Sequence, residues 1–172
     1  MRSLLVCGGW LAVITVAQTV AAPTLEIYHV KPDLFLISVI VVAMRRGGGS
    51  ALAWGLAAGA VQDALSGGII GFNLFSKPVT GFVVGLMRDK LDFANPNTQT
   101  VVTLFATLAE GAVLSVLLYA YHPPKNAFWT FTQVVIPLSV FNALVMPLVI
   151  LAERVAGTAA AEWRRRESRF AQ

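Results

Sequence analysis

The sequence contains few charged residues and very little cysteine or histidine. Only 13% of its 172 residues are charged, whereas 56% are hydrophobic. Such a chain has too few polar side chains to cover a soluble globule. The single cysteine, Cys7, excludes an internal disulfide. His29 and His122 each follow a tyrosine at the edge of an apolar run, which is typical of a membrane interface rather than of a metal site.

Catalytic motifs are also lacking. The sequence has no nucleophile elbow, no Ser-His-Asp pattern and no zinc-binding helix motif. The glycine-rich residues 45–50 lack the spacing and the lysine of a phosphate-binding loop, so they predict a flexible basic turn. We therefore expect a protein that is not an enzyme, with no catalytic residues, no metal and no cofactor.

Long apolar runs occupy most of the chain. They cover residues 4–22, 34–44, 51–65, 69–87, 98–121 and 126–151. These runs predict an all-α polytopic membrane protein with about six transmembrane helices in one domain, residues 1–152, followed by a basic cytoplasmic tail, residues 153–172. For the first run, a cleaved signal peptide is a minor alternative.

The second run is too short to cross a hydrocarbon core of about 30 Å. We expect it to recruit flanking residues, to thin the bilayer, or to be a partial span that neighbouring helices shield.

The basic residues predict the orientation. Lys31 and Lys125 fall on one side of the membrane, and ten other bases outside the runs fall on the side of both termini. The positive-inside rule therefore places both termini in the cytoplasm. Because these bases lie in loops rather than in a stripe, no nucleic-acid partner is expected. The ten are Arg2, Arg45, Arg46, Arg88, Lys90, Arg154, Arg164, Arg165, Arg166 and Arg169.

Small and polar residues join the third and fourth runs. Ala51, Gly55, Gly59 and Asp63 recur every four residues and so share one helix face, which a second helix can approach closely. A Ser-Gly-Gly turn follows, and the spacing of four continues onto the outgoing helix. We expect this stretch to be a packing and docking element, in which Asp63 either contacts a partner or caps the turn. Its residues are Gly55, Gly59, Asp63, Ser66, Gly67, Gly71 and Asn73.

Ionisable residues within apolar runs indicate a buried polar network. An unpaired charge at this depth is costly, so Lys77 needs a carboxylate. Glu110 matches Lys77 in depth better than Asp63 does, and we expect the two groups within about 6 Å of each other, in a network with Asn142. A pair that holds the helices in register is favoured over ion or proton translocation. Pro78 is expected to bend or break the fourth helix.

These residues resemble the rod shape-determining protein MreD family. The resemblance lies in the length, the six runs, Lys31-Pro32-Asp33 and the small-residue stretch. Ala60 is a departure, because leucine often follows the second glycine in the family. The residues of the stretch that carry the resemblance are Gly55, Gly59, Asp63, Leu65, Ser66, Gly67, Gly71 and Asn73.

The resemblance implies a non-catalytic inner-membrane component of the bacterial machinery for cell elongation and peptidoglycan synthesis. It implies binding to MreC and, indirectly, action with the MreB filament, the RodA glycosyltransferase and its transpeptidase partner. It also implies a fold similar to the substrate-binding membrane subunits of energy-coupling-factor transporters. The main alternative is a small-molecule (vitamin) binding subunit of such a transporter, and a second is a membrane enzyme of lipid or cell-wall precursor metabolism.

Overall fold

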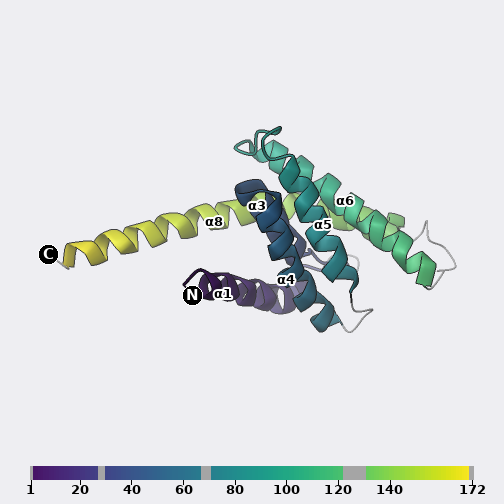
Figure 1. Cartoon of the computed structure of the whole chain (residues 1–172), viewed down its shortest axis with the longest axis horizontal. Helices are drawn as coiled ribbons and strands as arrows, with labels where there is room; N and C mark the ends of the chain where they lie inside the picture. The colour runs from purple at the N-terminus through teal and green to yellow at the C-terminus, as the bar shows by residue number, and fades with distance from the viewer. Residues whose placement is uncertain (1, 27–29, 67–70, 122–130, 171–172) are drawn as a thin grey trace.

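The computed structural model of the protein is built from helices (Figure 1). It describes residues 2–26, 30–66, 71–121 and 131–170. Within these ranges six helical segments follow one another, and no residue forms a strand. The prediction of an all-α protein with about six helices is therefore confirmed.

The helices coincide closely with the apolar runs. The first comprises α1 (Arg2–Val16), a π-helical turn η1 (Ala17–Ala21) and α2 (Ala22–Thr24); the next four are α3 (Leu34–Arg46), α4 (Gly48–Ser66), α5 (Phe72–Leu86) and α6 (Pro96–Tyr121). The last comprises η2 (Phe131–Val135) and α8 (Ile136–Phe170). Because α8 continues to Phe170, the segment predicted as a basic tail prolongs the sixth helix, which extends past the other helices in Figure 1.

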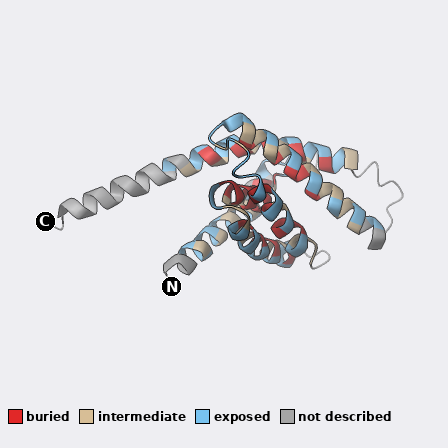
Figure 2. Cartoon of the chain, turned by 45° about the horizontal axis from the view of Figure 1, so that its top comes forward, coloured by how far each residue is buried: buried red, intermediate tan, exposed pale blue. Residues whose placement is uncertain are grey.

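The short helix α3 lies at the centre of the fold. It has 13 residues, about 20 Å at 1.5 Å per residue, and contacts α1, α4, α5, α6 and α8. Most of its side chains are buried, as the red segments near the middle of Figure 2 illustrate. A helix this short and this well covered fits the alternative of a partial span shielded by its neighbours. Its buried residues are Phe35, Leu36, Ile37, Val39, Ile40, Val41, Ala43 and Met44.

The outer surface is apolar while several buried side chains are polar. Phe105, Val116 and Leu144 are among the large apolar side chains that are exposed, whereas Lys77 and Asn142 are fully buried. This inverted distribution is expected for helices surrounded by lipid. Within the described ranges, two helical segments, Pro96–Leu117 and Phe131–Glu153, are long and apolar enough to cross a membrane, and Val6–Val20 forms a shorter apolar helix.

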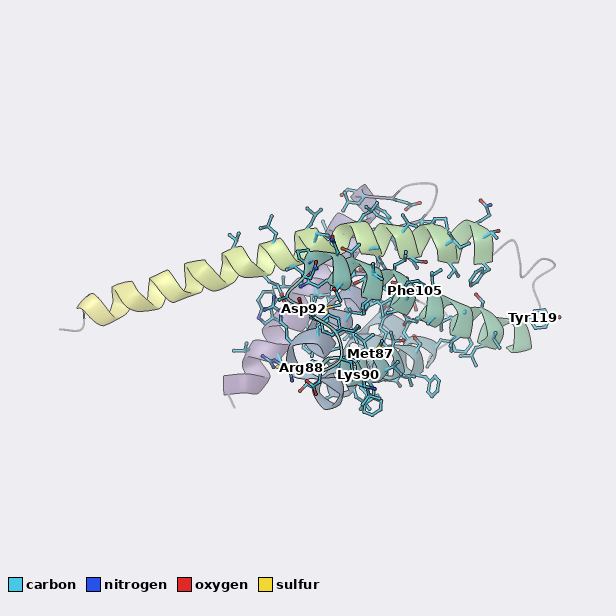
Figure 3. All side chains as sticks on the ribbon, turned by 90° about the horizontal axis from the view of Figure 1, so that it is seen from above. Met87, Arg88, Lys90, Asp92, Phe105 and Tyr119 are labelled. Carbon is cyan, nitrogen blue, oxygen red and sulfur yellow. The ribbon has the colours of Figure 1, made fainter. Side chains whose placement is uncertain are left out.

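Basic residues gather at one end of the molecule. Arg88 and Lys90 follow α5 and Asp92 precedes α6, and Tyr119 lies far from all three, toward the other end of α6 (Figure 3). At the end of α3, the guanidinium group of Arg45 is 2.6 Å from the carboxylate of Glu153 in α8. The connections after α3 and after α5 therefore lie on the side where α8 continues beyond Glu153.

Candidate functional site

Helix α4 packs against α5 through backbone contacts at glycines. A Cβ atom at Gly55 would lie 2.6 Å from the Cα of Pro78, and one at Gly59 would overlap the carbonyl group of Asn73. At the other end of the pair, a Cβ atom at Gly85 would overlap the backbone of Gly48. Only glycine permits such close approach. The structure thus brings Gly55 and Gly59 to the face where close packing was expected, and the contact continues to the end marked by Gly85.

Asp63 caps the start of α5. Its carboxylate accepts hydrogen bonds from the backbone N–H groups of Gly71 (2.9 Å), Asn73 (3.1 Å) and Leu74 (2.9 Å), and from the side-chain amide of Asn73 (2.9 Å). The residue is buried, with an exposed fraction of 3%. Backbone N–H groups at a helix start have no partner within the helix, so this carboxylate satisfies three of them. Of the two roles expected for Asp63, the contacts match the cap.

The turn between the two helices differs from the sequence-based prediction. Gly71 does not lie on the outgoing helix: it precedes α5 with a φ of 108°, in the left-handed region that glycine adopts without strain. It therefore serves the turn rather than a helix face. Ser66 ends α4, is exposed, and donates a hydrogen bond to the carbonyl of Asp63 (3.3 Å), whereas Gly67 lies outside the described residues.

Lys77 is fully buried in α5 and contacts two carboxylates. Its Nζ atom is 2.8 Å from Oδ2 of Asp33 and 3.3 Å from Oε1 of Glu110. The second distance falls within the separation of about 6 Å expected from the sequence. Ser76, the residue before Lys77, donates a hydrogen bond to the same Oε1 atom of Glu110 (2.8 Å). Glu110 in α6 therefore binds two neighbouring side chains of α5.

Pro78 does not break α5. The helix continues from Phe72 to Leu86 with Pro78 inside it, so of the two expected outcomes, a bend or a break, the break is wrong. Proline removes one N–H donor, which in an α-helix would bond to the carbonyl four residues earlier, that of Leu74. The backbone of Pro78 lies against Gly55 of α4, so packing on the neighbouring helix supports α5 where this hydrogen bond is missing.

Asp33 is the partner of Lys77 that the sequence-based prediction missed. It caps α3, where its Oδ1 atom accepts a hydrogen bond from the N–H group of Leu36 (2.9 Å). Its Oδ2 atom also accepts one from the side-chain amide of Gln62 in α4 (3.2 Å). Its own backbone N–H group donates to Oδ1 of Asn142 in α8 (2.9 Å). Asp33 therefore connects α3 with α4, α5 and α8.

The remaining contacts extend these hydrogen bonds to all six helices. In η1, Gln18 accepts a hydrogen bond from the N–H group of Leu34 (2.7 Å) and donates one to the carbonyl of Pro32 (3.1 Å). Asn142 in turn donates to the hydroxyl of Thr107 in α6 (3.3 Å). We call this set the Asp33 network; it consists of Gln18, Asp33, Gln62, Ser76, Lys77, Thr107, Glu110 and Asn142.

The network is suited to joining helices by hydrogen bonds and ion pairs. Each polar side chain bridges two helices or orients a group that does, and the low dielectric strengthens these bonds. In the part of the chain that the structure describes, no three His, Cys, Asp or Glu side chains form a group that could hold a metal ion.

The position of Asp33 has a recognisable cause in the sequence. Because the second run is so short, its first residue lies deeper than the ends of longer helices, and an N-capping acid there is carried inward with it. The start of α5 at Phe72 also places Lys77 only five residues, or about 7.5 Å, along that helix, within reach of the α3 cap.

Comparison with known proteins gives one informative match. Neither the curated proteins nor the solved structures contain a significant match to this chain. A family model described as rod shape-determining protein MreD matches residues 1–155. This range covers all six helical segments up to the point where α8 passes Glu153. The chain therefore belongs to the MreD family of rod shape-determining membrane proteins.

Proposed function

We propose that this protein is a non-catalytic component of the bacterial cell-elongation machinery in the inner membrane. The observation that carries the proposal is the family match over residues 1–155, which assigns the chain to rod-shape determination. The Asp33 network supports a scaffold role, because its charged groups are directed at one another and at helix ends. In this role the protein binds an MreC-like single-span partner and, through it, acts with the MreB filament and the RodA synthase pair.

The proposed orientation has both termini in the cytoplasm. Support comes from the end of α3, where Arg45 pairs with Glu153 of α8 and the side chain of Arg88 lies within 4 Å of the place that a Cβ atom at Gly47 would take. Cytoplasmic loops of membrane proteins carry an excess of such bases. The turn organised by Asp63 lies at the other end of α4 and so faces outward.

The partner contact is proposed at the outward end of the α4–α5 pair. Asp63 determines where α5 begins, and next to this cap the side chains of Leu65 and Phe75 are exposed by 50% and 58%. A helix start that Asp63 caps, flanked by exposed apolar side chains, suits the apolar segment of a membrane partner at the point where it leaves the bilayer.

Copurification of the partner with exposed-residue variants tests this site. Phe75→Ala should leave the membrane abundance of the protein unchanged and lower the recovery of an MreC-like partner per unit of protein several-fold. The matched control is Phe105→Ala, which truncates a phenylalanine of α6 with a similar exposed fraction, 64%. Equal recovery with the two variants would place the contact elsewhere, and no recovery with the unmodified protein would contradict the proposed function itself.

A further inference from the structure

The charged groups of the Asp33 network do not balance. The network holds two carboxyl groups, from Asp33 and Glu110, and one ammonium group, from Lys77. Its other members are neutral amides and hydroxyls. Among the described residues no further charged side chain forms an ion pair with these three, and Asp63 of α4 directs its oxygens to the start of α5 instead. With both acids ionised, the site would carry an uncompensated buried negative charge, which is strongly unfavourable.

The two carboxyl groups differ in how well their oxygens are satisfied. Both oxygens of Asp33 accept hydrogen bonds, from Leu36 N–H, Gln62 and Lys77, and the N-terminus of α3 adds a favourable dipole. The Asp33 side chain is also 14% exposed, against 4% for Glu110. For Glu110, Ser76 and Lys77 share Oε1, while Oε2 has no hydrogen-bond partner among the described residues. The surroundings therefore favour the ionised form of Asp33 over that of Glu110.

We propose that this site binds one proton, carried on Oε2 of Glu110, while Asp33 is the ionised partner of Lys77. Oε1 of Glu110 is then a carbonyl oxygen, which accepts from the hydroxyl of Ser76 and from Lys77, as the distances of 2.8 Å and 3.3 Å require. The buried site is neutral as a whole. The inference rests on charge and geometry and not on the proposed partner, so either can fail without the other.

Loss of this proton would change how α5 is held. An ionised Glu110 would compete with Asp33 for Lys77, so the ammonium group would be shared more evenly between α3 and α6. Because the two acids interact through Lys77, loss of the proton is a property of the pair rather than of Glu110 alone.

Infrared spectroscopy of the full chain reconstituted in lipid bilayers tests the proposal. At neutral pH the protein should show the C=O stretching band of a buried carboxylic acid. Carbon-13 labelling of glutamate side-chain carboxyls should shift this band, whereas the same labelling of aspartate should leave it in place. A band that is absent, or that follows the aspartate label, would overturn the assignment. This measurement needs no substitution, so it does not depend on the folding of any variant.

Three variants extend the test. Glu110→Gln should abolish the band, and the control Glu153→Gln, which changes the partly exposed glutamate paired with Arg45, should keep it. Lys77→Met should raise its intensity about twofold, because without the ammonium group both acids become neutral. An unchanged band in folded Glu110→Gln protein would show that another acid holds the proton.

Discussion

At the residue scale, Asp33 and Glu110 differ in how much each stabilises the buried ammonium group of Lys77. The ammonium group lies 2.8 Å from Asp33 and 3.3 Å from Glu110. Removal of one partner from a buried pair leaves an uncompensated charge, which costs roughly 3–5 kcal/mol. The consequence of each substitution therefore depends on which acid neutralises Lys77.

We predict that Lys77→Met lowers the free energy of unfolding by an amount on the order of 3 kcal/mol. The abundance of the protein in membranes should fall as a result. Adding Asp33→Asn should restore much of the loss, because it removes the acid that must otherwise take up a proton, and asparagine still caps α3. Adding Glu110→Gln instead, the rescue that the sequence alone suggests, should restore little. Thermal unfolding of the purified variants measures both effects, and a greater rescue by Glu110→Gln would assign the ion pair to Glu110.

The residues of the site differ in how visible they are in the sequence. Lys77 and Glu110 stand out because each interrupts an apolar run. Asp33 follows Lys31 and Pro32 and looks like an ordinary loop residue. The short run after it allows an inward position, but its burial also depends on how the other helices pack around α3. Gln18 and Gln62 also cannot be identified from the sequence, because a glutamine within an apolar run carries no charge that requires a partner.

At the element scale, the α4–α5 pair depends on the absence of side chains along its seam. We predict that Gly59→Ala destabilises the protein by about 1–3 kcal/mol, and Gly59→Leu by more, because a Cβ atom would meet the backbone of Asn73 rather than a movable side chain. Gly49→Ala is the matched control in the same helix, where a Cβ atom meets nothing within 4 Å. It should be neutral or stabilise by up to about 1 kcal/mol.

Urea or thermal unfolding in detergent, together with abundance in membranes, measures the difference between these glycine variants. Equal stability of the proteins with Gly59→Ala and Gly49→Ala would mean that α4 and α5 can separate at no cost. A loss at Gly49 alone would locate the essential contact on the other face of α4.

The helices themselves follow from the apolar runs, but their ends do not. The run beginning at residue 69 predicts a helix that includes Gly71, whereas α5 starts at Phe72. The difference arises because Asp63, from the preceding helix, binds N–H groups of Gly71, Asn73 and Leu74 and so defines the first turn of α5. Pro78 likewise looks like a break in isolation, although packing on α4 keeps the helix continuous. Both outcomes depend on tertiary contacts that periodicity does not encode.

At the scale of the whole molecule, polar side chains lie at the centre and apolar side chains lie on the surface, which is the reverse of their distribution in a soluble helix bundle. Charged and neutral polar side chains at the centre join the six helical segments, and large apolar side chains on α5, α6 and α8 face outward. Such a fold requires a surrounding bilayer, and its orientation within that bilayer depends on the loops, because the core has no preferred side. We therefore propose that the bases near the end of α3, such as Arg45 and Arg88, set the direction of insertion.

We predict that a phosphatase reporter, which is active only outside the cytoplasm, is inactive when fused after Gln172 or after Lys90. It should be active when fused after Tyr121, because α6 runs from the basic end to the opposite end of the molecule. Replacing Arg45, Arg46, Arg88 and Lys90 with glutamine should reduce the difference in reporter activity between these fusion sites. Loops that carry such bases are retained in the cytoplasm, and the glutamine variant would lack this bias. Substituting the acid Asp92 in the same loop is the control, because acidic residues contribute little to topology. An active reporter after Gln172 in the unmodified chain would invert the orientation and place the turn capped by Asp63, with its proposed partner contact, on the cytoplasmic side.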